Sequence, residues 1–190
     1  MAILKIAKMG HPVLLRRADE IVDPMAPAVQ NLIEDMFETM VDADGLGLAA
    51  PQVHVPLRLV IFHAPNDDGD VEEPRVLINP EITPLSQDLV LGWEGCLSVP
   101  GLRGKVPRYH AIRYTGLDAA GNAVDVTAEG MHARVVQHEC DHLDGRLYPT
   151  QMADLADLIF DSEWRHHLGA TGADEGDDTP TDREGENDHG

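Results

Sequence analysis

The chain has 190 residues, 43% of them hydrophobic, and a formal net charge of −20 at pH 7. This length and apolar content suit one compact domain with a buried core. A charge so negative argues against a nucleic acid or an anionic membrane as partner, because either would require a basic surface to meet its phosphates.

Residues 1–10 contain no apolar run long enough for a signal peptide, and no segment approaches the roughly 20 apolar residues that a membrane helix needs. We therefore predict a cytoplasmic protein. Its two cysteines, Cys96 and Cys140, are then expected to bind a metal or to be buried, because disulfides are rare in a reducing compartment.

The first half of the chain predicts a helix, a loop and strands. From about residue 25 to before Gly45, apolar side chains recur at helical spacing: Val29, Leu32, Ile33, Met36, Phe37 and Met40. Residues 45–52 (Gly-Leu-Gly-Leu-Ala-Ala-Pro-Gln) are expected to form a loop, because their glycines and proline interrupt regular structure. The apolar, β-branched runs 57–62 and 75–78 predict strands.

The second half predicts more sheet and two further helices. A glycine-punctuated stretch and a hairpin are expected at residues 92–100, 110–117 and 123–127. Residues 130–143 predict a second helix, with Gly145 as its C-terminal cap, and a third is expected from about 152 to 167. Strands scattered among separated helices favour an α+β fold over an alternating parallel α/β fold.

The C-terminal segment differs from the rest in composition. Residues 169–190 contain eight Asp or Glu residues and one Arg. Such a segment cannot bury enough apolar surface to offset the entropy lost on ordering. We therefore predict a folded catalytic domain over residues 1–168 and a disordered acidic tail over residues 169–190.

The segment His138-Glu139-Cys140-Asp141-His142 matches the HExxH pattern. Two histidines four residues apart lie one turn apart on the same helix face, so both imidazoles can reach one metal ion. Glu139 then stands beside the ion, where a general base is needed. An ordinary helix that carries two histidines is the competing interpretation of so short a pattern.

A catalytic metal site needs a third protein ligand. The metzincin extension would place a histidine at position 148, which is Tyr148. Cys96, flanked by glycine in an expected loop, is a soft donor that would complete a His2Cys site with one open position. Cys140 lies about 200° around the helix from each histidine and is expected to be a buried apolar side chain.

Three segments resemble the signature motifs of the peptide deformylase family: residues 45–52 (GLGLAAPQ), 94–98 (EGCLS) and 137–143 (QHECDHL). The resemblance extends from Ile3 to about Tyr148. It implies an α+β fold in which antiparallel sheets pack around a central helix carrying HExxH. It also implies a hydrolase that removes the formyl group from N-formylmethionine at the start of newly synthesised polypeptides, releasing formate, with Fe2+ as the natural metal.

The resemblance also implies roles for single residues. The implied metal ligands are Cys96, His138 and His142. Glu139 would be the general acid/base, while Gln52 and the backbone N–H of Leu97 would donate hydrogen bonds to the developing oxyanion. Chemistry requires each part, because a metal lowers the pKa of its bound water toward roughly 7 and amide hydrolysis needs both a proton carrier and charge stabilisation.

Three neighbouring residues have weaker assignments. Gly47 and Gly95 would let a substrate strand approach the backbone, although glycine used only for turn geometry is an equal alternative. Glu94 would orient a ligand histidine by a hydrogen bond, or it would be an ordinary surface residue. Arg134 departs from the family pattern, since an aliphatic residue is more common there near the methionine pocket.

Two rival functions remain open at this point. A zinc peptidase would use the same helix with a third His or a downstream Glu, and a non-catalytic metal-binding module would close the site with a fourth ligand. Cys/His2 coordination also suits Zn2+ or another divalent transition metal. The expected partners are N-formylmethionyl peptides on nascent chains. The ribosome is a further candidate, although the acidic tail has no counterpart in the family.

Overall fold

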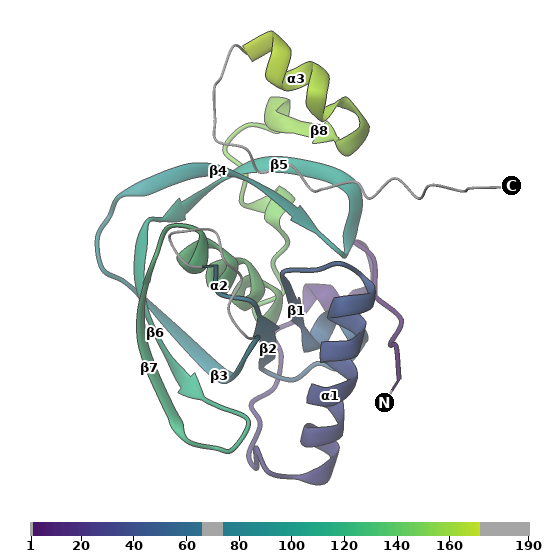
Figure 1. The fold of residues 1–190 in the computed structure, drawn as a ribbon, viewed down its shortest axis with the longest axis vertical. Helices are drawn as coiled ribbons and strands as arrows, with labels where there is room; N and C mark the ends of the chain where they lie inside the picture. Colours follow the sequence, from purple (N-terminus) through teal and green to yellow (C-terminus); the bar gives the residue numbers. More distant parts are fainter. Residues whose placement is uncertain (1, 66–73, 172–190) are drawn as a thin grey trace, which may run out of the picture.

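Two antiparallel sheets enclose a central helix in the computed structural model, which describes residues 2–65 and 74–171 (Figure 1). The larger sheet has the strand order β1 (Gly47–Ala49), β2 (Leu59–Phe62), β3 (Arg75–Pro84), β6 (Ala111–Leu117) and β7 (Ala123–Glu129). The smaller sheet consists of β4 (Leu89–Cys96), β5 (Val99–Tyr109) and β8 (Leu158–Phe160). This arrangement confirms the predicted α+β class.

Helix α1 (Pro27–Asp42) confirms the first predicted helix. Pro27 occupies its first turn, where the fixed φ of proline suits a helix and the missing N–H needs no partner. The helix presents one apolar face to a core cluster that also contains side chains of β2 and β3; its fully or nearly buried members are Val29, Ile33, Met36 and Met40. Its opposite face is polar.

Helix α2 (Gly130–Leu143) begins and ends as predicted. Gly130 and Gly145 both have positive φ, at 56° and 72°, which glycine adopts without strain. All residues from 133 to 143 are buried, because the two sheets and the N-terminal segments surround this helix. The HExxH residues therefore lie in the interior of the molecule.

Two segments that were expected to be irregular contain strand. Within residues 45–52, β1 pairs with β2 from Gly47 opposite Phe62 to Ala49 opposite Val60, and a 3-10 turn follows. Cys96 is the last residue of β4, in a hairpin whose register shifts between Gly95 and Cys96. Pairing of β1 with β2 and of β4 with β5 overrides the local preference of these glycines for loops.

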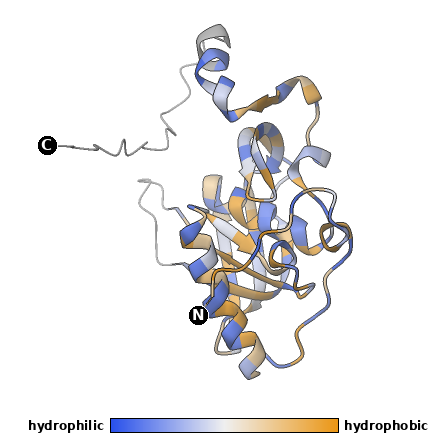
Figure 2. Cartoon of the chain, turned by 90° about the vertical axis from the view of Figure 1, so that its right-hand side faces the viewer, coloured by the Kyte–Doolittle hydropathy of each residue, from blue (hydrophilic) through white to orange (hydrophobic). Residues whose placement is uncertain are grey.

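The third predicted helix is wrong over most of its length. Residues 155–157 form a 3-10 turn, β8 pairs with β5, and only α3 (Trp164–Thr171) is helical. The short apolar run of β8 fits either a helix or a strand by itself, and the free edge of β5 decides between them. Trp164 then packs edge-on against Trp93 of β4, with ring centroids 4.8 Å apart. Figure 2 shows this segment projecting from the rest of the molecule.

The predicted tail falls largely outside the described residues, because the description ends at residue 171, three residues beyond the predicted boundary. The division at residue 168 and the disorder of the tail therefore stay predictions. Among the described residues, no helix combines the length and the apolarity that crossing a membrane requires.

Candidate metal centre and active site

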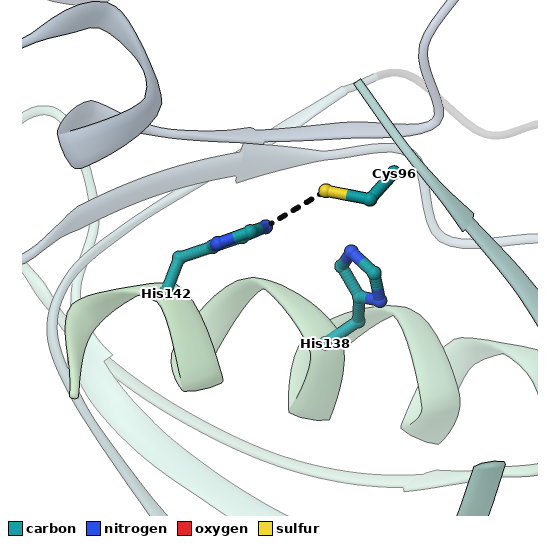
Figure 3. Close-up of side chains that lie close together, drawn as sticks. All are labelled: Cys96, His138 and His142. Atoms are coloured by element: carbon teal, nitrogen blue, oxygen red, sulfur yellow. Dashed lines mark hydrogen bonds between the residues drawn. The ribbon is translucent and has the colours of Figure 1, made fainter. Parts of the chain in front are cut away.

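The structure brings the three predicted metal ligands together. The ligand atoms of Cys96, His138 and His142 all lie within 4.8 Å of one another. Figure 3 shows the two imidazoles rising from successive turns of α2 toward the sulfur of Cys96, which comes from the end of β4. The sulfur and His142 Nε2 are 3.4 Å apart. Two elements separated in sequence thus converge on one point.

The donor set fits a divalent transition metal. Bond lengths of about 2.3 Å to sulfur and 2.1 Å to nitrogen at a tetrahedral angle place the two donor atoms about 3.6 Å apart, close to the separation of Cys96 and His142. Three protein ligands leave one coordination position for water or substrate. The ligand group contains no fourth protein donor within the described parts of the chain, as a closed structural site would need.

His138 is oriented by a buried carboxylate. Its Nδ1 lies 2.8 Å from Glu94 Oε2, which leaves Nε2 to face the metal position. Arg108 donates to both oxygens of the same carboxylate, from Nε at 2.8 Å and from a terminal nitrogen at 3.0 Å. Glu94 is 6% exposed, so the surface alternative is wrong. Although burial raises the pKa of Glu94, the hydrogen bonds from His138 and Arg108 lower it to about 2.

The two ligand imidazoles have opposite electrostatic surroundings. Burial lowers the pKa of His142 well below its ordinary value, which favours the neutral ring that a metal requires. Burial acts the same way on His138, but the Cys96 thiolate and Glu94 raise the pKa of that ring well above its ordinary value. A proton therefore competes with a cation at His138 more strongly than at His142.

Glu139 lies where a proton carrier is needed. Its Oε2 is buried and has no hydrogen-bond partner among the described residues. Burial raises the pKa of Glu139 to about 7, against the opposing effect of His138. Gly47 makes room for this side chain, since a Cβ at that position would lie 2.3 Å from Glu139 Oε1. Neither Gly47 nor Gly95 has a positive φ, and Gly95 lies at the register shift of the β4–β5 hairpin.

Gln52 is anchored with its amide nitrogen toward the ligand sulfur. Its Oε1 accepts a hydrogen bond from the N–H of Ala49 at 2.8 Å. Its Nε2 lies 3.2 Å from Ser98 Oγ and 3.6 Å from Cys96 Sγ. With the side chain 1% exposed, the amide is held as a donor beside the metal position. Leu97 directly follows Cys96 in the turn between β4 and β5.

The side chains that were expected to stay outside the ligand set do so. Cys140 is buried in the core cluster that contains β3 and β6 residues, and burial raises its thiol pKa far above the usual range. Tyr148, at the position where a metzincin carries a histidine, stacks its ring on His138 at a centroid distance of 6.2 Å. It contributes no ligand atom to the group.

Sequence reasoning missed the ion-pair network behind the ligands. Arg108 donates to Asp141 as well as to Glu94, and Arg134 donates to Glu94 Oε1 at 2.8 Å. The paired residues lie 14 to 40 positions apart in the sequence and on different elements, so no local pattern pairs them. One signal was present: Arg134 lies inside the predicted second helix, one turn before a candidate ligand, and an arginine buried there needs partners.

Fold and site together define an α+β enzyme with a Cys-His-His metal centre on an HExxH helix. The model of the polypeptide deformylase family matches residues 3–157. Peptide deformylase 1 of Bordetella pertussis is 58% identical over 154 residues, covering 79% of this chain and 88% of the relative. The chain therefore belongs to the peptide deformylase family, and its activity is that of a peptide deformylase.

Further relatives agree in sequence and in structure. Peptide deformylase 2 of Ralstonia nicotianae is 52% identical over 174 residues, covering 87% of this chain and 98% of the relative. The crystal structure of a Met-Ala-Ser-bound class I type b peptide deformylase from Acinetobacter baumannii superposes with a TM-score of 0.74 at 36% identity. It covers 80% of this chain and 99% of that one. The family match over residues 3–157 includes the three candidate metal ligands, Cys96, His138 and His142.

Proposed function

We propose that this chain removes the formyl group from N-formylmethionine at the start of newly synthesised polypeptides, with Fe2+ held by Cys96, His138 and His142. The observation that carries the proposal is the convergence of these three donors beside the buried carboxylate of Glu139. Met-Ala-Ser bound to the Acinetobacter baumannii relative supports a methionyl peptide as the substrate class.

A divalent cation at this position would supply hydroxide near neutral pH by lowering the pKa of its water toward roughly 7. Glu139, with its buried Oε2 free of other partners among the described residues, would hold a proton during the attack and deliver it to the nitrogen of the leaving amine. Its pKa of about 7 suits both directions of transfer. Because Glu139 serves in both proton uptake and proton delivery, the reaction needs no second general acid.

The remaining residues orient the substrate and the ligands. Gln52 Nε2 and the backbone N–H of Leu97 donate hydrogen bonds to the formyl oxygen as it gains negative charge. Gly47 and Gly95 let the substrate backbone approach the two strands that flank the site. Glu94 holds the tautomer and the ring plane of His138.

The metal could also be Zn2+ or another divalent transition metal, because cysteine and histidine ligands suit several ions. Iron remains our proposal from the family resemblance. The proposed partners are formylated nascent chains, with the ribosome as the surface on which they emerge. Such substrates place the proposed site of action in the cytoplasm.

Metal quantification together with formate release from a formyl-methionyl tripeptide tests the proposal. We expect about one metal ion per chain and stoichiometric formate, with Fe2+ giving the highest turnover when the apoprotein is reloaded. Cleavage of internal peptide bonds without formate would indicate the zinc-peptidase alternative. Tight metal binding without either product would indicate a non-catalytic binding module.

A further inference from the structure

Arg134 joins three elements around the metal centre. Its side chain leaves α2 one turn before His138 and is buried, with 8% of the residue exposed. Its guanidinium donates to the carbonyl oxygen of Val90 at 2.7 Å on β4 and to that of Val106 at 2.9 Å on β5. It also donates to Glu94 Oε1 at 2.8 Å. These hydrogen bonds use both terminal nitrogens of the guanidinium.

The neighbouring backbone is shaped to receive this guanidinium. A Cβ at Gly92 would lie 2.7 Å from the central carbon of the Arg134 guanidinium, closer than real contacts allow. Gly92 has no positive φ, so space rather than backbone freedom explains the glycine. The arginine is fixed by several acceptors, so it cannot easily move aside. Gly92 and Arg134 therefore form a matched pair.

Arg134 completes the set of donors on Glu94. Arg108 donates to both oxygens of this carboxylate, and His138 Nδ1 lies against Oε2. Arg134, on α2, adds a second donor on Oε1. Four hydrogen bonds fix the orientation of the Glu94 carboxylate, and this carboxylate in turn fixes the orientation of the His138 ring.

We propose that Arg134 is a positioning residue of the metal centre, which fixes the ring of His138 through Glu94 and depends on Gly92 for its own placement. The inference rests on the proposed ligand set. The role is indirect, because the hydrogen bonds of the Arg134 guanidinium go to Glu94 and to backbone carbonyl oxygens of β4 and β5, and not to the ligand sulfur or a ligand imidazole.

Metal affinity is the readout that separates positioning from mere structural support. We would load the apoprotein with Co2+, whose absorption spectrum reports the geometry of its ligands, and measure the dissociation constant. Arg134→Met keeps much of the volume and removes all donors. We expect binding about 10-fold weaker, at the lower end of effects for residues behind a ligand, because Arg108 still holds Glu94. Arg134→Lys, which keeps one charge, should recover part of the affinity.

Arg113→Met is the matched control. Arg113 also pairs with a carboxylate, that of Asp125, but the pair is exposed on the larger sheet. This variant should bind Co2+ like the wild-type protein, with the same spectrum. A shared loss of affinity in the Arg113 and Arg134 variants would trace the effect to general destabilisation and overturn the positioning role.

A double-mutant cycle tests the pairing with Gly92. Gly92→Ala pushes a methyl group against the guanidinium, so it should weaken Co2+ binding several-fold while Arg134 is present. In the Arg134→Met background the flexible methionine can yield, so the added methyl group should cost little. Equal effects of Gly92→Ala in both backgrounds would contradict the pairing.

The two levels of the inference fail in different ways. If Cys96 is a ligand, the Co2+ protein shows a thiolate charge-transfer absorption that the Cys96→Ser variant lacks. Absence of this absorption from Co2+-loaded wild-type protein would overturn the ligand set and the inference with it. A wild-type spectrum with that absorption, together with unchanged affinity and spectrum in folded Arg134→Met and Arg134→Lys proteins, would overturn the role of Arg134 alone.

Discussion

Helices α1 and α2 are built from the same kind of backbone but buried in opposite ways. In α1 the buried side chains fall on one face and all but Thr39 are apolar. In α2 the last eleven residues are all buried, and six of them are polar or charged: Arg134, Gln137, His138, Glu139, Asp141 and His142. Helix α1 contributes apolar side chains to the core, whereas α2 places the candidate site residues in the interior.

The difference shows where the two helices gain their stability. Each apolar side chain buried by α1 contributes about 1.5–3 kcal/mol by leaving water. Polar groups buried by α2 would cost free energy without partners, and most have them: Gln137 bonds both backbone groups of Tyr109, and Asp141 receives Arg108. Glu139 Oε2 and His142 Nδ1 are exceptions among the described residues, and both belong to the proposed site.

The largest expected effect concerns the two cysteines, of which Cys96 ends β4 and Cys140 lies on α2. Cys96→Ser should lose most of the bound metal and nearly all formate release, because the proposed site takes the sulfur of Cys96 as a ligand. Cys140→Ser should keep both, since its side chain lies in the core away from the ligands. Metal content by mass spectrometry and a formate assay decide the matter. Equal loss in both variants would contradict the ligand assignment.

Glu139→Gln separates proton transfer from metal binding within α2. The variant keeps the shape of the side chain but cannot accept a proton. We expect near-stoichiometric metal and a folded protein, with kcat lower by roughly 100- to 10,000-fold and KM little changed. A variant that holds metal and turns over at close to the wild-type rate would refute the proposed mechanism while leaving the family assignment intact.

For α1 the same comparison predicts a loss of stability without a loss of chemistry. Met36 is fully buried, so Met36→Ala should lower the free energy of unfolding by about 2–5 kcal/mol. Activity per folded molecule should stay unchanged. Glu34→Ala, on the exposed face of the same helix, is the control and should change stability by less than about 0.5 kcal/mol. A selective fall in kcat for the Met36 variant would show that α1 also shapes the site.

Acid should weaken the surroundings of α2 through Glu94. Its folded-state pKa of about 2 lies below the ordinary value of 4.5, so the associated stability is present above pH 4.5 and is lost as the pH falls toward 2. A shift of this size corresponds to about 3 kcal/mol. Denaturant unfolding at pH values from about 5 to about 2.5 measures this loss. Glu94→Gln should flatten that dependence.

The smallest effect is expected for the C-terminal residues. Their composition predicts that they do not pack on the body, so a chain ending at residue 171 should keep its melting temperature and its rate of formate release. Truncation before β8 is the informative contrast, because it removes the strand pairing with β5 and the contact of Trp164 with Trp93. A fall of several degrees after the shorter deletion would show that the tail contributes to folding.

The sequence by itself determined the elements whose signals are local. Helical spacing placed α1, the uninterrupted run between two glycines placed α2, and the turn at Gly121 placed the β6–β7 hairpin. The spacing of His138 and His142 needs only one helical turn to create half of the metal site. The resemblance of three motifs then supplied Cys96 and the family.

Tertiary structure alone decided the features that depend on distant partners. The apolar run of β8 becomes a strand because β5 offers it a free edge. Glu94 is buried because Arg108 and Arg134 converge on it from β5 and α2, and Gly47 is small because Glu139 fills the space beside it. The ion pairs of Glu94 span 14 and 40 residues of sequence, and the β5–β8 and Gly47–Glu139 contacts span more, so no local pattern records them.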